Sequence, residues 1–129
     1  MVERVRLEHL SEFCYAIHMI DTMQTRDFYC DFVLNHKIEV EILKETKNVL
    51  AFLHTKPSWT LHIVLIPKTH VTRLVDVQDM EMVKEIFEVA REIILEKKLH
   101  ETNYKIITNG GSFQDSQHLH FHLVSGEKI

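Results

Sequence analysis

The chain has 129 residues, of which 45% are hydrophobic and 26% are charged, and its formal net charge at pH 7 is -4. This size suits one domain with its own core, and the scattered lysines and arginines exclude a basic surface for nucleic acid. No stretch approaches the roughly 18 apolar residues of a membrane span, no secretory signal opens the chain, and Cys14 and Cys30 form no disulfide framework, so we expect a cytoplasmic protein.

The first predicted element is a helix near the N-terminus. Apolar side chains recur at spacings of three and four over residues 6–23, which is the pattern of an amphipathic helix. We therefore expect residues 1–26 to form an N-terminal helical extension to a domain that covers residues 27–129.

Three extended segments are predicted next. Residues 40–42 and 49–53 are apolar and extended in character, and the polar residues 44–48 between them indicate the turn of a hairpin. Residues 61–66, "LHIVLI", form a dense β-branched run that is typical of a buried strand. His62 is the one polar residue in this run, which makes it a candidate for a functional role.

The longest predicted helix covers residues 79–98, where apolar side chains follow the spacing of one helical face. Asp76 and Asp79 are both candidates for its N-cap. Residues 104–108 then predict a strand, and the Asn-Gly-Gly sequence at 109–111 predicts a turn with positive φ. The order of elements favours an α+β fold in which a mainly antiparallel sheet packs against the long helix.

The last predicted strand carries an unusual concentration of histidine. Residues 118–124 read "HLHFHLV". Because successive side chains of a strand point to opposite faces, His118, His120 and His122 share one face. The apolar residues between them, Leu119, Phe121 and Leu123, face the core.

Three imidazoles on one face suit the transfer of a phosphoryl or nucleotidyl group. A neutral imidazole is a good nucleophile near pH 7, and neighbouring N–H donors stabilise the negative charge of the transition state. Two other interpretations remain open from the residues alone. The histidines are either ligands of a metal ion, since alternating histidines on a strand also bind zinc, or simply the outer face of a half-buried strand.

Four motifs in a fixed order resemble the histidine triad (HIT) superfamily. They are residues 49–57, 61–70, 104–111 and the triad itself at 118–124, and the resemblance covers roughly residues 27–126. It implies a five-stranded antiparallel sheet with one long helix and a protein that forms a homodimer. It also implies a hydrolase or nucleotidyl transferase that acts on a nucleoside phosphoramidate or a dinucleoside polyphosphate and releases a nucleoside monophosphate.

By this resemblance, His120 is the nucleophile that attacks the α-phosphorus and carries the nucleotidyl group. His122 contacts the phosphate oxygens or the leaving group, and His118 supports the hydrogen-bond network. His62 corresponds to a family histidine that approaches the triad from the adjacent strand. The chemistry requires no cofactor, because the site itself supplies the hydrogen-bond donors.

The resemblance implies substrate contacts for Asn109 and Gln114, and it also shows two departures. Asp115 stands where the family often has Ser or Thr, so a carboxylate lies beside the phosphate unless it turns away or Ser116 supplies the hydroxyl. His54 stands where nucleotide-binding members usually have an acidic residue for the ribose hydroxyls. A preference for purine nucleotides therefore does not transfer to this chain.

A structural zinc ion is the weaker alternative at the start of the domain. Many family members have C-x-x-C there, whereas this chain has Asp27 in place of the first cysteine. Asp27, Cys30 and His70 offer an O, S and N donor set, but we favour Cys30 as a plain buried residue.

Two other functions remain open beside the enzyme. The first is a nucleotide or phosphate sensor that binds without turnover, which Asp115 and His54 favour. The second is a zinc-binding protein that uses the three triad histidines as ligands.

Overall fold

The computed structural model describes residues 29–35 and 37–129. The helix predicted over residues 6–23, together with Cys14 and Asp27, lies outside the described residues. The helical extension at 1–26 therefore stays a prediction.

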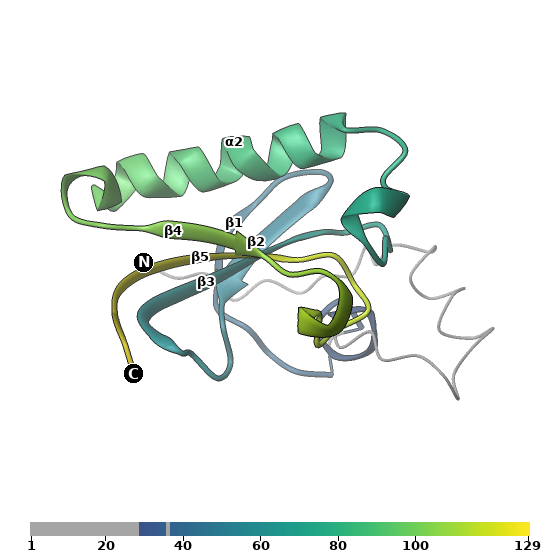
Figure 1. Cartoon of the computed structure of the whole chain (residues 1–129), viewed down its shortest axis with the longest axis horizontal. Coiled ribbons are helices and arrows are strands. Elements are labelled where there is room, and N and C mark those ends of the chain that lie inside the picture. The colour runs from purple at the N-terminus through teal and green to yellow at the C-terminus, as the bar shows by residue number, and fades with distance from the viewer. Residues whose placement is uncertain (1–28, 36) are drawn as a thin grey trace.

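A single antiparallel sheet forms the centre of the fold (Figure 1). Its five strands lie in the order β1-β2-β3-β5-β4. In chain order they are β1 (Ile42–Glu45), β2 (Val49–Leu53), β3 (Trp59–Pro67), β4 (Lys105–Thr108) and β5 (Phe121–Lys128). Every neighbouring pair is antiparallel. The α+β class with a five-stranded sheet and one long helix is confirmed.

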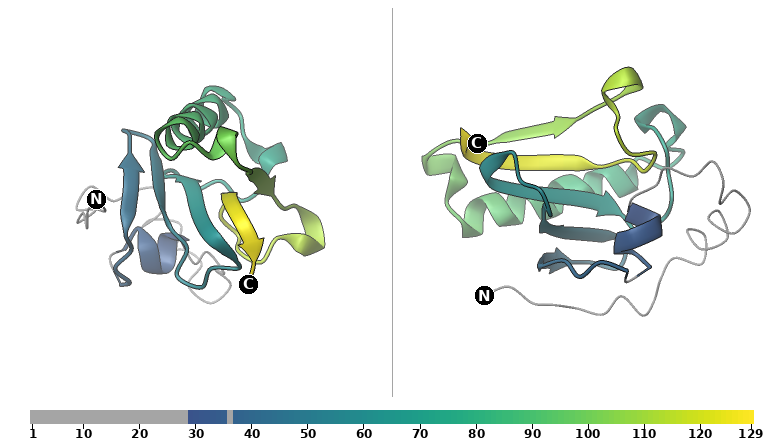
Figure 2. Two further views of the ribbon diagram at one scale, coloured as in Figure 1. Left: turned by 90° about the vertical axis from the view of Figure 1, so that its left-hand side faces the viewer. Right: turned by 90° about the horizontal axis from the view of Figure 1, so that it is seen from below.

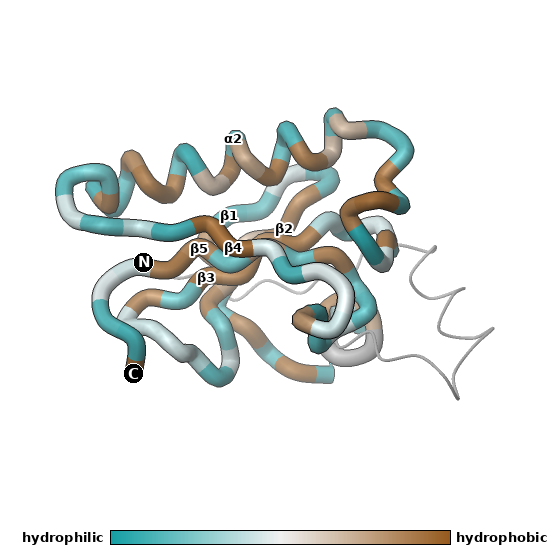
Figure 3. Tube along the Cα trace, in the orientation of Figure 1, coloured by the Kyte–Doolittle hydropathy of each residue, from teal (hydrophilic) through white to brown (hydrophobic). Residues whose placement is uncertain are grey.

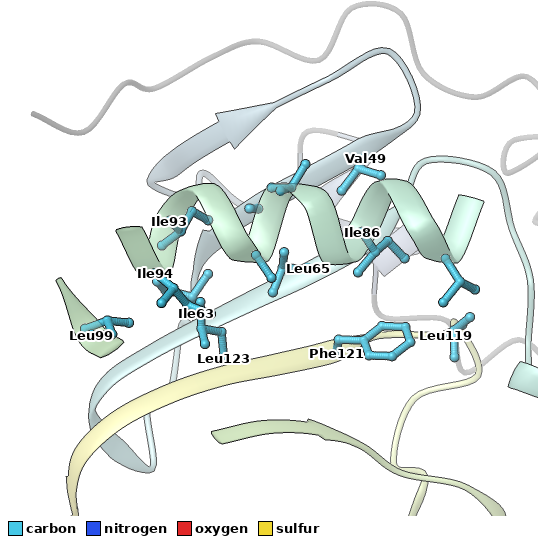
Figure 4. Close-up of a cluster of buried hydrophobic side chains, with 14 residues drawn as sticks. Val49, Ile63, Leu65, Ile86, Ile93, Ile94, Leu99, Leu119, Phe121 and Leu123 are labelled. Atoms are coloured by element: carbon cyan, nitrogen blue, oxygen red, sulfur yellow. The ribbon is translucent and has the colours of Figure 1, made fainter. Parts of the chain in front are cut away.

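The long helix α2 (Glu81–Glu96) lies across one face of the sheet (Figure 1). Its polar and apolar residues alternate along the tube in Figure 3, as expected of a helix with one buried side. Buried residues of the helix meet apolar residues of β3, β5 and the segment before β5, as Figure 4 shows. The principal contacts in this layer are Ile86, Ile93, Ile63, Leu65, Leu119, Phe121 and Leu123.

A shorter helical turn, η1 (Tyr29–Val33), covers the opposite face, and Figure 2 shows it across the sheet from α2. Tyr29, Cys30, Val33 and Leu34 pack there against apolar residues of the first three strands, Ile42, Leu50, Phe52, Val64 and Ile66. Three 3-10 turns complete the connections: η2 (Leu74–Asp76), η3 (Leu99–Glu101) and η4 (Gly111–Phe113). The sheet is therefore buried on both faces, with the longer layer under α2.

Some element boundaries differ from the prediction. β1 begins at Ile42 and continues through Glu45, because Lys44 and Glu45 pair with Ala51 and Leu50 of β2, which shortens the predicted turn. At the start of α2, Asp79 accepts a hydrogen bond from the Glu81 N–H at 3.0 Å.

Two further predictions concern the N-cap of the long helix and the Asn-Gly-Gly turn. Asp76 lies in η2 and pairs with Arg73, and Met80 is the N-cap residue of α2, so neither aspartate predicted as the N-cap occupies that position. Gly111 has the positive φ, +60°, that the Asn-Gly-Gly turn predicted. In the described part of the chain, no helix is long and apolar enough to cross a membrane.

Candidate active site

The pairing of β3 with β5 brings two histidines together. His62 lies opposite Val124, and Val64 lies opposite His122, so the two imidazoles are diagonal neighbours on one face of the sheet. This is the face away from α2, because Leu119, Phe121 and Leu123 all lie in the layer under α2. The alternation predicted for residues 118–124 is confirmed, although β5 itself begins only at Phe121.

His120 is buried, with 3% of its surface exposed, and its ring is held by the backbone. Its Nδ1 lies 2.7 Å from the carbonyl oxygen of His118. A carbonyl can only accept, so Nδ1 carries the proton and Nε2 carries the lone pair of the neutral ring. Thr108 donates its hydroxyl to the carbonyl of His120 at 2.9 Å and fixes this segment against β4. The geometry leaves Nε2 as the nucleophilic atom.

His62 and His122 form a relay whose direction is set by a backbone N–H. The N–H of Ser58 donates to Nδ1 of His62 at 3.0 Å, so the proton of the neutral His62 ring is on Nε2. That Nε2–H then donates to Nδ1 of His122 at 2.8 Å. The proton of His122 is consequently on its own Nε2, which is available as a donor to a bound anion.

His54 lies beside this relay and has its proton placed in the same way. The N–H of Lys56 donates to Nδ1 of His54 at 2.9 Å, which leaves the proton on Nε2. The ring of His54 lies 4.3 Å from the ring of His62, centroid to centroid. His54 therefore presents a donor to the cavity, where the carboxylate usual in the family would present an acceptor.

The three neighbouring imidazoles are neutral at pH 7. Burial, followed by the charge of His54, lowers the pKa of His62 to about 4. Burial, followed by the charges of His120 and His62, likewise lowers the pKa of His122 to about 4. Burial also lowers the pKa of His54, and Asp115 opposes that shift. Neutral rings with N–H donors in this arrangement suit the binding of an anion.

A cavity of about 260 Å³ opens next to these histidines. Its walls are partly apolar and partly polar, and they comprise Tyr29, Phe52, His54, Thr55, Lys56, Val64, Asp115 and Ser116. Ser116 is 5% exposed, and its hydroxyl has no hydrogen-bond partner within the described chain. A buried hydroxyl without a protein partner is costly, which makes Ser116 a candidate donor to a bound ligand.

His118 belongs to a different environment from the rest of the triad. Its Nε2–H donates to the carbonyl of Pro67 at 2.7 Å, and its Nδ1 lies 3.3 Å from Sγ of Cys30. Nδ1 of His70 lies 3.7 Å from the same sulfur. His118 thus supports the site through its backbone carbonyl, which accepts the hydrogen bond that orients the ring of His120.

Cys30, His70 and His118 have ligand atoms close enough to share a metal ion. Cys30 is disulfide-bonded in this structure, so its sulfur is not the thiolate that zinc requires. The donor set as it stands does not fit a zinc ion. The zinc set with Asp27 stays a prediction.

His54, His62 and His122 are also close enough to share a metal ion. The backbone N–H groups of Lys56 and Ser58 occupy Nδ1 of His54 and His62, however, and leave protons on the Nε2 atoms. A metal-bound histidine normally donates its other N–H to an acceptor, so this arrangement suits a bound anion better. Among the described residues, His118 belongs to the first group, His122 to the second and His120 to neither, so the triad histidines do not share one ion site.

The other predicted contact residues lie around the same end of the sheet. Asn109 is half-buried immediately after β4. Gln114 is half-buried and donates one amide N–H to the carbonyl of Thr72, which leaves the second N–H for other partners.

Sequence reasoning missed three features of the site. The ring of Tyr29 lies 5.0 Å from the ring of His120, and Tyr29 forms one wall of the cavity. The N–H groups of Lys56 and Ser58 set the histidine tautomers. A tyrosine in a short helical turn has no periodic signal, and backbone donors leave no trace in residue identities.

Comparisons with known proteins agree with this geometry. Residues 35–129 match the HIT domain family. An adenosine 5′-monophosphoramidase of Saccharomyces cerevisiae is 34% identical over 104 residues, which cover 78% of this chain and 64% of the yeast protein. An uncharacterised HIT-like protein of Rickettsia prowazekii is 31% identical over 102 residues, which cover 75% of this chain and 85% of that protein.

Solved structures show the same fold. The crystal structure of a HIT family hydrolase from Legionella pneumophila matches with a TM-score of 0.71 and 29% identity. The match covers 79% of this chain and 94% of that chain.

Proposed function

The chain belongs to the HIT domain family, and on that premise we propose that it is a hydrolase or nucleotidyl transferase acting on nucleoside phosphoramidates or dinucleoside polyphosphates. The observation that carries the proposal is the lone pair on Nε2 of His120, which follows from the hydrogen bond of Nδ1 to the His118 carbonyl. This nitrogen lies 3.6 Å from Oδ1 of Asp115, a residue of the cavity wall, and the ring of His120 lies 4.9 Å from the ring of His122.

The proposed reaction has two displacement steps at phosphorus. Nε2 of His120 attacks the α-phosphorus, the bond from phosphorus to the leaving nitrogen or oxygen breaks, and the leaving group departs with one proton taken from solvent. Water then attacks the phosphorus of the His120-bound nucleotide and releases one proton to solvent. The N–P bond breaks, nucleoside monophosphate leaves, and the neutral imidazole is restored.

The remaining residues hold the phosphate in this mechanism. Nε2–H of His122, oriented by His62, donates to the phosphate oxygens as negative charge develops. The buried hydroxyl of Ser116 donates to another oxygen, which gives this group the partner that it lacks in the free protein. Asn109 and Gln114 supply amide donors at the rim.

The names of relatives support the phosphoramidate branch of the proposal. The yeast relative is an adenosine 5′-monophosphoramidase, and a second protein with that name, from Candida albicans, is 30% identical over 105 residues. A P–N bond suits the site because the departing nitrogen, once protonated, is a good leaving group.

The decisive test is turnover by the wild type and by His120→Ala in the presence of EDTA. We expect monophosphate release that survives EDTA and falls by about 10⁴-fold in His120→Ala, a loss typical of removing a nucleophile. His100→Ala is the matched control, because His100 is an exposed histidine in η3. Acid-labile labelling of His120 by a radioactive substrate identifies the intermediate. Equal activity in His120→Ala would contradict the proposal.

One observation favours a second candidate, a sensor that binds nucleotide without turnover. Oδ1 of Asp115 lies 3.6 Å from Nε2 of His120 and competes with a phosphate for that position. The sensor predicts saturable nucleotide binding without monophosphate release from any substrate. Asp115→Ser and His54→Asp are then the variants to test for gain of turnover.

The proposal also covers the oligomeric state, the cellular location and the ligand of the enzyme. We expect a homodimer that works in the cytoplasm without a cofactor and binds a nucleotide-type small molecule. Strand β4 is an open edge of the sheet, and Phe87 and Tyr104 near it are each 46% exposed, which supports an interface there. Sedimentation equilibrium measures the oligomeric state directly.

A further inference from the structure

The carboxylate of Asp115 stands directly in front of the proposed nucleophile. Its Oδ1 is 3.6 Å from Nε2 of His120, and its side chain is 88% exposed. A reacting phosphorus must come within about 3–3.5 Å of the attacking nitrogen, so the carboxylate and the phosphate compete for one position.

The side chain of Asp115 can rotate into solvent, whereas the backbone at Asp115 is held in place by its buried neighbours. The adjacent Ser116 is 5% exposed, and His118, three residues away, is fully buried with both ring nitrogens in contact with the protein. Because the side chain of Asp115 is short and its open side is solvent, the carboxylate remains beside the bound phosphate at the mouth of the cavity. Two negative groups then lie next to each other.

The charges lining the cavity show what can offset this repulsion. Of the residues that form its walls in the described chain, Asp115 is the one carboxylate and Lys56 is the one ammonium group. The nearby rings of His54, His62 and His122 supply donors that are neutral near pH 7. The ion-pair contact of Asp115 within the described chain is with His120 and not with Lys56, so a positive charge on the substrate is the complement that this carboxylate lacks.

We propose that Asp115 is a specificity-determining residue that selects substrates whose leaving group carries a positively charged amine close to the scissile bond. This inference rests on the proposed function. The cation lies between the carboxylate and the phosphate, attracts both, and leaves with the departing group. The attraction depends on distance and needs no alignment of orbitals, so it does not change the two displacement steps.

The two substrates that test this differ only in one terminal group. Both are adenosine 5′-phosphoramidates, one made from ethylenediamine and the other from ethanolamine, so the leaving group ends in an ammonium or in a hydroxyl group. We expect wild-type kcat/KM to favour the ammonium substrate by about two- to fivefold at low salt, the range of an exposed ion pair, and the preference to shrink as salt rises.

Asp115→Asn keeps the shape of the side chain and removes its charge. We expect the ratio of the two kcat/KM values to fall to about 1, with the hydroxyl substrate cleaved at least as well as by the wild type. Glu101→Gln, which removes an exposed carboxylate in η3, is the matched control and keeps the wild-type ratio.

The outcomes separate this inference from the proposed function. A wild type without preference, or an Asp115→Asn variant that keeps the preference, overturns the inference while the function stands. If neither substrate is cleaved, the proposed function fails, and the ratio of the two dissociation constants in wild type and Asp115→Asn then decides the inference by itself.

Discussion

The two faces of the sheet are both buried, but they are built from different chemistry. The face under α2 is built around an apolar cluster, in which residues such as Leu65 pack together with the helix. The opposite face combines an apolar cluster around Phe52 with buried histidines whose protons are placed by backbone groups. Burial on the first face therefore stabilises the fold. Burial on the second face stabilises it less, because part of the buried surface belongs to imidazoles that are kept neutral and oriented.

This difference explains how one small domain keeps the rings of His62, His120 and His122 in fixed positions relative to one another. The apolar face fixes the strands, and the strands then present His62 and His122 at a spacing that a hydrogen bond of 2.8 Å can close. Stability and reactivity are separated by the alternation of side chains along β5.

The largest expected effect comes from a cavity on the apolar face. Leu65 is fully buried, so Leu65→Ala should lower the free energy of unfolding by about 2–5 kcal/mol. Activity per folded molecule should stay close to wild type. Leu65→Met, which conserves volume, should cost less than about 1.5 kcal/mol. Urea unfolding and assays at low temperature measure both quantities, and a loss of activity without a loss of stability would break the comparison.

The pH dependence of stability should come from the histidine face. The pKa values of His62 and His122 are about 4 in the folded protein and about 6.5 when the chain unfolds, so the unfolded chain binds more protons between these limits. Their contribution is complete above pH 6.5 and is lost as the pH falls toward 4, by up to about 1.4 kcal/mol per pH unit for each histidine.

The control for this pH dependence is His62→Gln. Removing one of the two groups should reduce the slope of stability against pH between 4.5 and 6.5, whereas Leu65→Ala should lower the whole curve without changing its slope. Urea unfolding over this range measures the slope, and an unchanged slope in His62→Gln would refute the assignment.

The smallest expected effect tests the backbone donor behind the relay. Ser58→Pro removes the N–H that holds the proton of His62 on Nε2, so turnover should fall by about tenfold as the relay loses its direction. Ser58→Ala retains the N–H and should keep most of the activity. Comparable losses in both variants would mean that the serine side chain is what matters.

Much of the fold could be predicted from the sequence, because periodic patterns report burial. The spacing of apolar residues placed α2, and the alternation in residues 118–124 placed Leu119 and Phe121 in the core. Asp76 pairs with Arg73 and not with the start of α2, and the boundary of β1 follows from its pairing with β2. Periodicity reports neither contact.

The candidate site was predictable in part. His62, His120 and His122 come together as expected, but His118 turns to Cys30 and His70, and Tyr29 enters the cavity wall without a signal in the sequence. The role of His54 also changed, because its Nδ1 accepts a backbone N–H and only a donor remains for the cavity.

By itself, the sequence determined the strand and helix pattern, the face that carries the triad and the family to which the chain belongs. These properties are local, since they depend on the periodicity and order of residues along the chain. The tertiary structure alone decided which nitrogen of each imidazole carries the proton, which groups bury Ser116 and how close Asp115 lies to His120. These properties depend on contacts between segments far apart in the chain, and such contacts exist only once the sheet has closed.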